Sequence, residues 1–188
     1  MLEEDISMII DMAQESMDDA IEHLQKELVK IRTGKASPAM LGGLLVPYYG
    51  SPTPLNQVSN VSTSDARTLV IQPWEKSMLA PIEKVIFEAN LGVTPQNNGE
   101  IIIINIPPLT EERRRDLVKN AKALGEDSKV SIRNARRDAI NELKKAVKDG
   151  LPEDIGKRKE GDVEDLTKKY QEKVDAMIAA KEKDIMTI

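Results

Sequence analysis

Arginine and lysine recur along residues 109–148 at a spacing that gathers them on one side of a helix. At 100° per residue, eight basic side chains fall within about 60° of Arg133. They are Arg115, Lys119, Lys122, Lys129, Arg136, Arg137, Lys144 and Lys148. The guanidinium group presents a planar fork of N–H donors that matches phosphate. The pattern therefore favours binding of a polyanion.

Helix stability does not explain this basic stripe. Like charges four residues apart, as at Arg133 and Arg137, destabilise a helix. Residues 109–149 have 12 basic and 8 acidic groups, whereas residues 1–33 have 3 basic and 9 acidic groups. The alternative interpretation is a charged helix face that contacts water and binds no partner. The separation of charge within a chain of net charge −5 instead favours an interface with a polyanionic partner.

One long helix over residues 109–148 is expected to position these side chains. Thr110 and the acidic pair Glu111–Glu112 form a start signal, and Asp149–Pro152 forms a stop signal. Small and apolar residues recur every three or four positions on the other side, as a buried seam requires. These residues are Leu117, Ala121, Leu124, Ser128, Ile132, Ala135, Ala139 and Ala146.

Two further long helices with seams of coiled-coil period are predicted at the two ends of the chain. They cover residues 3–32 and 162–185, and residues 153–161 are predicted to be a charged connector. Three such helices can bury their seams against one another as a bundle. Because the seams satisfy one another, we expect a monomer.

Residues 35–106 have a different character, with seven of the ten prolines. Strands are predicted at 44–49, 67–72 and 101–106, with a turn at 50–54 and a short helix capped by Ser77. The consecutive isoleucines at the start of the last strand predict burial on both of its faces. These elements predict a small β/α/β unit.

The predicted fold class is therefore α+β, a long antiparallel three-helix bundle with an inserted β/α/β domain. Residues 1–32 and 108–188 form the bundle, and residues 33–107 form the insertion. Two short connectors join them, which favours a hinge. The predicted hinge residues are Arg32, Thr33, Gly34, Asn105, Ile106, Pro107 and Pro108.

No residues have the types and spacing of a catalytic or metal site. His23 is the one histidine, and the absence of cysteine removes thiolate nucleophiles, disulfides and thiolate metal ligands. Arg32–Ser37 has a Gly-Lys pair but lacks the first glycine of a phosphate-binding P-loop. We therefore expect no enzymatic activity, no metal and no cofactor.

The composition excludes several kinds of binding partner and cellular location. Aromatic residues make up 3% of the chain, too few for a ladder of stacking platforms for single-stranded bases. No apolar run approaches a membrane span, and the acidic start Met1–Asp5 is unlike a signal peptide. We expect a cytoplasmic protein with no membrane and no DNA partner.

Four segments in this order resemble bacterial ribosome recycling factors. They cover the first connector, the first predicted strand and turn, the start of the middle helix, and the centre of the basic stripe. The segments are Ile31–Pro38 (IRTGKASP), Tyr48–Leu55 (YYGSPTPL), Pro107–Arg114 (PPLTEERR) and Ile132–Ala139 (IRNARRDA). Four collinear segments over essentially the whole chain are more specific than any one of them.

The resemblance implies an L-shaped protein, similar in outline to a transfer RNA, with a three-helix bundle and a β/α/β domain. It implies a role after translation termination, in which the factor binds the large-subunit side of the ribosome. With elongation factor G and GTP it would promote splitting into subunits and release of mRNA and deacylated tRNA. The rRNA-binding residues would be Arg133, Arg136 and Arg137. We extend this set along the stripe to Arg115, Lys119, Lys122 and Lys129.

Two other hypotheses remain open from the residues alone. A coiled-coil scaffold could use the basic stripe to meet an acidic protein, which predicts a shallower dependence of affinity on salt than binding to RNA. An enzyme could use a metal held by carboxylates, which predicts that magnesium, calcium or manganese raises the melting temperature.

Overall fold

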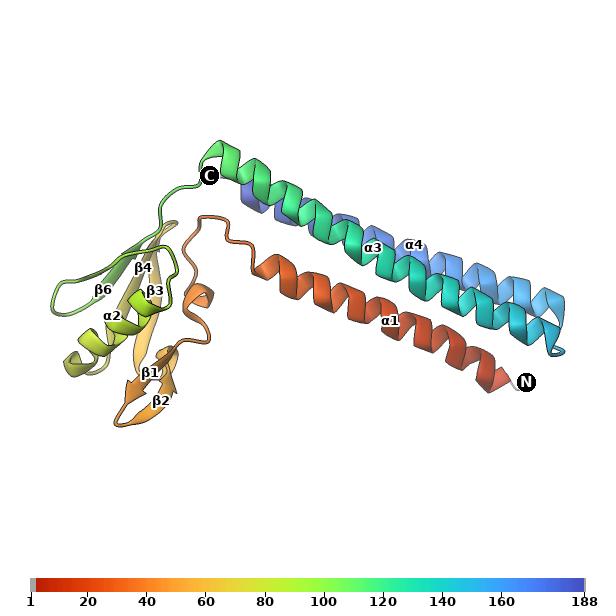
Figure 1. Ribbon diagram of the computed structural model, residues 1–188, viewed down its shortest axis with the longest axis horizontal. Coiled ribbons are helices and arrows are strands. Elements are labelled where there is room, and N and C mark those ends of the chain that lie inside the picture. The colour runs from red at the N-terminus through yellow and green to blue at the C-terminus, as the bar shows by residue number, and fades with distance from the viewer. Residues whose placement is uncertain (1–2, 188) are drawn as a thin grey trace. The chain divides into compact units, whose positions relative to one another are not determined.

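The computed structural model describes residues 3–187 of the chain. The chain divides into two compact units, with the boundaries between Arg32 and Thr33 and between Thr110 and Glu111. One unit contains the long helices and the other contains the strands, and each is described by itself (Figure 1). We call them the bundle and the β unit.

Three long helices form the bundle. They are α1 (Glu3–Val29), α3 (Glu111–Lys148) and α4 (Glu153–Met186). A tight turn joins α3 to α4, and the two helices then run antiparallel along each other (Figure 1). Near that turn, Ile6 at the start of α1 packs in one cluster with Leu143 of α3 and Val163 of α4. α1 therefore runs antiparallel to α3, and the predicted three-helix bundle is confirmed.

The predicted seam of the middle helix forms the buried face of α3. All of its residues are buried except Leu124, which is half-buried. Gly125 and Leu143 are buried on the same side. The seam follows from the helical period because a side chain every three or four positions returns to one face. Small residues along it let neighbouring helices approach closely.

The prediction of a connector at residues 153–161 is wrong. α4 begins at Glu153, directly after the turn at Asp149–Pro152. Gly156 faces α3, where a Cβ would lie 2.5 Å from Cγ2 of Val147. This glycine permits a close helix approach and does not end a helix. The acidic residues Glu153 and Asp154 favour the helix start through the helix dipole.

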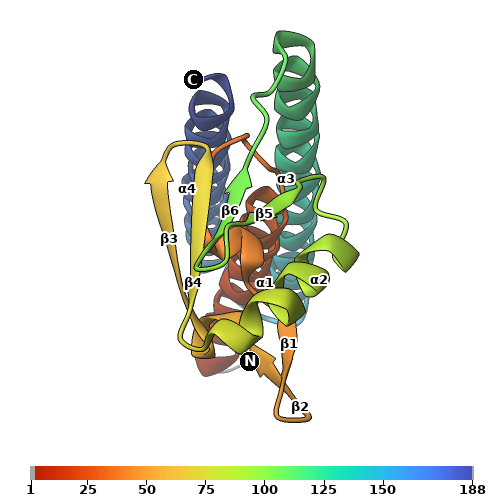
Figure 2. The same ribbon diagram turned by 90° about the vertical axis from the view of Figure 1, so that its left-hand side faces the viewer.

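The β unit contains a four-stranded antiparallel sheet in the order β3-β4-β6-β5. These strands are β3 (Ser59–Asp65), β4 (Thr68–Pro73), β5 (Pro95–Asn97) and β6 (Ile102–Asn105). A separate hairpin pairs β1 (Leu45–Tyr48) with β2 (Ser51–Pro54), and short 3₁₀ turns cover Pro38–Leu41, Leu55–Gln57 and Lys76–Met78. The helix α2 (Leu79–Glu88) lies across the sheet (Figure 2).

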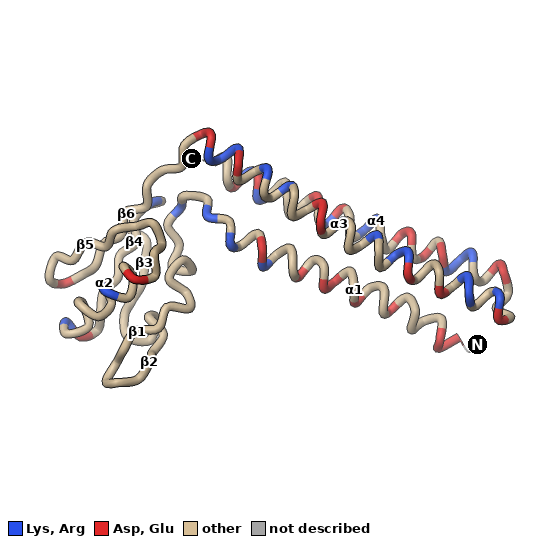
Figure 3. Tube along the Cα trace, viewed as in Figure 1, with Lys and Arg blue, Asp and Glu red and all other residues tan. Residues whose placement is uncertain are grey.

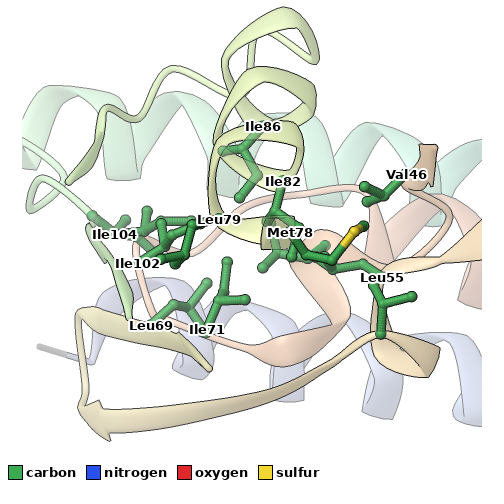
Figure 4. Packing of buried hydrophobic residues seen from close by; sticks show 13 residues of the cluster. Val46, Leu55, Leu69, Ile71, Met78, Leu79, Ile82, Ile86, Ile102 and Ile104 are labelled. Carbon is green, nitrogen blue, oxygen red and sulfur yellow. The ribbon is translucent and has the colours of Figure 1, made fainter. Parts of the chain in front are cut away.

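The core of the β unit lies between α2 and the sheet. Leu79 and Ile82 of α2 point toward Leu69 of β4 and Ile102 and Ile104 of β6 (Figure 4). All five side chains are buried. In β6 burial alternates, so Ile103 is only half-buried, as is Ile101 just before the strand. The expectation that both faces of this strand are buried is wrong, because α2 covers one face only.

Two local predictions in the β unit are also wrong. The turn predicted at residues 50–54 is confined to Tyr49 and Gly50, and residues 51–54 form β2. The φ angles of +48° at Tyr49 and +81° at Gly50 match a type I′ hairpin turn. Ser77 does not cap α2, because the helix starts from Met78 at the end of a 3₁₀ turn, without a side-chain cap.

Candidate nucleic-acid interface

All seven predicted RNA-binding residues lie on α3, away from its buried seam. Basic segments recur along this helix, whereas acidic segments dominate α1 (Figure 3). Lys129 and Arg136 are half-buried and the other five are exposed. The seven are Arg115, Lys119, Lys122, Lys129, Arg133, Arg136 and Arg137, and together with Lys144 and Lys148 they make up the basic stripe. One straight helix therefore presents them along one surface.

Acidic residues of α4 neutralise one edge of the basic stripe. Three stripe residues at a spacing of seven form ion pairs with α4. The pairs are Lys122–Glu182 at 3.8 Å, Lys129–Asp175 at 2.6 Å and Arg136–Glu164 at 3.0 Å. A spacing of seven returns nearly to the same side of a helix, so these residues share the edge next to α4. We call them the paired edge.

The other side of the stripe has positive charges without such partners. Within residues 3–187, Lys119, Arg133 and Arg137 form no ion pair. Lys144 and Lys148 lie on the same side of α3 and also form no ion pair within these residues. We call these five residues the open row. Arg133 and Arg137, like Lys144 and Lys148, are like-charged pairs four residues apart, which costs the helix stability. The open row is therefore the part of the stripe best placed to bind a polyanion.

Arg115 belongs to neither group. It forms an ion pair at 2.7 Å with Glu111, one turn earlier on the same helix. Both side chains are largely exposed, so the pair contributes little to stability and a stronger anion can displace it.

The predicted hinge residues lie in the two connectors and at the end of β6. Asn105 is the last residue of β6 and accepts a hydrogen bond from the Thr68 hydroxyl at 3.2 Å. Ile106 is buried, and its N–H donates to the carbonyl of Arg67 at 2.8 Å. These two residues are therefore attached to the sheet, unlike Pro107 and Pro108.

The first connector is attached to the same turn of the sheet. The N–H of Ala36 donates to the carbonyl of Ala66 at 2.7 Å, and Ala66 lies between β3 and β4. Gly34 has a φ of +76°, and a Cβ at this position would lie 2.9 Å from Cγ of Leu109. The two connectors thus touch each other at Gly34 and Leu109.

Aromatic side chains are exposed on the β unit, which the low aromatic content did not predict. Tyr49, Trp74 and Phe87 are largely exposed. The hydroxyls of Tyr48 and Tyr49 donate to the two carboxylate oxygens of Glu75, at 2.9 and 3.1 Å. These hydrogen bonds raise the pKa of both phenols. Large exposed aromatic groups are typical of protein contact surfaces.

Within residues 3–187, the structure has no cluster of His, Asp or Glu side chains able to hold a metal ion. His23 is exposed on α1, as the helical pattern predicts. No helix in this part of the chain is long and apolar enough to span a membrane.

The family model for ribosome recycling factor matches residues 24–186. The ribosome-recycling factor of Flavobacterium johnsoniae is 56% identical, covering 98% of this chain and 99% of the relative. The factor of Porphyromonas gingivalis is 51% identical, covering 98% and 100%. The chain belongs to the ribosome recycling factor family. The resemblance seen in the sequence is therefore confirmed, and with it the assignment to a family of non-enzymatic translation factors.

Solved structures of ribosome recycling factors share the fold. A solution structure of a ribosome recycling factor matches with a TM-score of 0.80 at 36% identity, over all of both chains. A model of the Thermus thermophilus factor matches with a TM-score of 0.63 at 42% identity, over 97% of this chain and 99% of that one. That model shows the factor and Escherichia coli elongation factor G bound to the E. coli post-termination complex. The predicted fold class is confirmed.

Proposed function

We propose that this protein is a cytoplasmic ribosome recycling factor that binds large-subunit rRNA of the post-termination ribosome through α3. With elongation factor G and GTP it promotes splitting of the ribosome into subunits and release of mRNA and deacylated tRNA. Membership of the ribosome recycling factor family supports the role in recycling. The model of the Thermus thermophilus factor supports the post-termination ribosome and elongation factor G as partners.

The open row is the observation that supports RNA as the ligand of α3. Arg133 and Arg137 lie one helical turn apart, and the residues 3–187 supply neither with an ion pair. Such an arrangement is unfavourable in the free protein and becomes favourable beside phosphates. Contact with the backbone of structured RNA needs arginine and lysine, and it does not need aromatic stacking.

The connectors support a hinge, with bending expected on the bundle side of the sheet. Ala36 and Ile106 are each held by a backbone hydrogen bond to the turn between β3 and β4. We expect bending on the bundle side of these two hydrogen bonds, within residues 32–35 and 107–110. This range includes Arg32, Thr33, Gly34, Pro107 and Pro108 of the predicted hinge, and Asn105 and Ile106 move with the sheet.

Co-sedimentation with isolated large and small ribosomal subunits, at low and high salt, tests the proposed function. We expect the protein to sediment with the large subunit and to be released as salt rises, because several counterions are exchanged. The double variant R133E/R137E should lose this binding and keep the helical circular dichroism signal.

A matched double variant on α4, K168E/K169E, makes the same change in net charge. Both lysines are exposed and form no ion pair within residues 3–187. This control should retain most of the binding. If R133E/R137E binds as well as the control, the stripe is not the RNA surface. A salt-insensitive association would instead favour an acidic protein as the partner.

A further inference from the structure

The ion pair between Arg136 and Glu164 leaves the arginine incompletely satisfied. The Nη1 atom of Arg136 contacts both carboxylate oxygens of Glu164, at 3.0 and 3.3 Å. One nitrogen therefore makes both contacts, and the two-pronged geometry that arginine forms with carboxylates is absent. The Nε atom of Arg136 is buried and has no hydrogen-bond partner within the described chain.

Glu164 occupies a donor that phosphate would use. A carboxylate and a phosphate both present oxygen acceptors to the guanidinium group, so a phosphate that takes the N–H donors held by Glu164 must displace it. The side chains of Arg136 and Glu164 are 39% and 51% exposed, which leaves the pair open to solvent. Ion pairs this exposed are weak, so an RNA phosphate can replace Glu164.

The other pairs of this edge are less suited to exchange. The side chain of Lys129 is only 22% exposed and lies 2.6 Å from Asp175. Lys122 and Glu182 are 3.8 Å apart, which leaves the lysine largely unrestrained. Arg136 alone among these three combines a fork of donors, partial exposure and an unpaired nitrogen.

We propose that Glu164 is an internal competitor for phosphate at Arg136, and that it holds the RNA affinity of the basic stripe below the value its positive charges could provide. The inference rests on the proposed function. RNA binding then includes an exchange step, in which Arg136 leaves Glu164 and turns to a phosphate. The cost of breaking the pair is subtracted from the binding free energy.

Replacing Glu164 by glutamine removes the competing charge and keeps the shape of the side chain. For binding of the full-length protein to isolated large ribosomal subunits, E164Q should raise the affinity roughly two- to fivefold, the range that an exposed ion pair represents. The helical circular dichroism signal should not change.

Two controls separate release of Arg136 from a general change in charge. D165N removes the same charge one residue away on α4, and Asp165 forms no ion pair within residues 3–187. D165N should raise the affinity less than E164Q does. In an R136Q background, E164Q should have no larger effect than D165N, because no arginine remains to be released.

Equal effects of E164Q and D165N, or an undiminished effect of E164Q in the R136Q background, would overturn the inference. Either result would leave the RNA-binding stripe in place, since the wild-type protein would still bind the large subunit in a salt-dependent way. If the wild-type protein does not bind the large subunit, the proposed function fails first and this inference fails with it.

Discussion

The hydroxyl of Tyr170 on α4 donates a hydrogen bond to the carboxylate of Asp18 on α1. Tyr170 is 2% exposed and is the largest fully buried side chain among the described residues. Its burial, reinforced by the hydrogen bond to Asp18, raises the pKa of the phenol to about 12. The Nζ atom of Lys173 lies 4.8 Å from the centre of the ring. A polar contact thus joins the first and last helices of the bundle.

This contact predicts a loss of stability at high pH. The pKa of Tyr170 is raised in the folded state, so its contribution is complete below pH 10 and is lost as pH rises toward 12. We expect the free energy of unfolding to fall by about 2 kcal/mol at most over this interval from this group. Urea unfolding of the wild type and Y170F between pH 9 and 12 measures the effect.

The Y170F variant should show a flatter pH profile than the wild type above pH 10. The control Y49F removes an exposed phenol whose raised pKa is screened by solvent, so it should change the wild-type profile less than Y170F does. Parallel profiles of Y170F and the wild type would show that the Tyr170–Asp18 contact does not couple to stability.

Two glycines on long helices should respond in opposite directions to alanine. A Cβ on Gly125 would lie 2.7 Å from Cγ1 of Ile178, whereas a Cβ on Gly161 would meet nothing within 4 Å. Both changes gain helix propensity of about 1 kcal/mol. G161A should therefore stabilise the bundle, and G125A should destabilise it by about 1–2 kcal/mol because over-packing outweighs the gain. Thermal unfolding at 222 nm compares them, and a stabilised G125A would mean that α3 and α4 can separate at little cost.

Gly34 should tolerate alanine less well than Gly43 does. Both have a positive φ, +76° and +83°, which costs an alanine about 1–2 kcal/mol. At Gly34 the Cβ would also meet Leu109, whereas at Gly43 the space is open. Hydrogen exchange of the β unit should show a larger loss of protection for G34A than for G43A. Adding L109A should recover the difference, and no recovery would argue against the steric cause.

The two units should unfold separately if the predicted domains are independent. Ile104 of β6 and Leu143 of α3 are both fully buried, and truncation of such side chains to alanine costs about 2–5 kcal/mol. I104A should accelerate hydrogen exchange in the β unit, and L143A should accelerate it in the bundle. If either variant affects both units equally, the chain folds as one cooperative body and the predicted domain division is wrong.

Features carried by a single helix were predictable from the sequence. The seam of α3 and its basic stripe follow from the helical period alone, because every residue concerned lies on one element. Contacts between elements were not predictable in this way. The neutralisation of Arg136 depends on Glu164, which is 28 residues away and faces it only once α4 packs against α3.

The wrong prediction of a connector at residues 153–161 and the missing prediction of the strand Ser59–Asp65 have the same cause. Gly156 resembles a helix breaker until Val147 is seen opposite it, where a side chain would not fit. The strand Ser59–Asp65 is mostly polar and largely exposed, so its sequence lacks the apolar alternation that marks a half-buried strand. Its place in the sheet comes from pairing with β4.

The contact between Gly34 and Leu109 affects how the bundle can fold. In the unfolded chain, the segment between α1 and α3 is a long loop, and closing it costs entropy that grows with the logarithm of its length. Once the β unit has folded, the two ends of this loop are already adjacent. The helices are then joined as if by a link of a few residues, which lowers the closure cost by about 2 kcal/mol. Early folding of the insertion would therefore speed the assembly of the helices on either side of it.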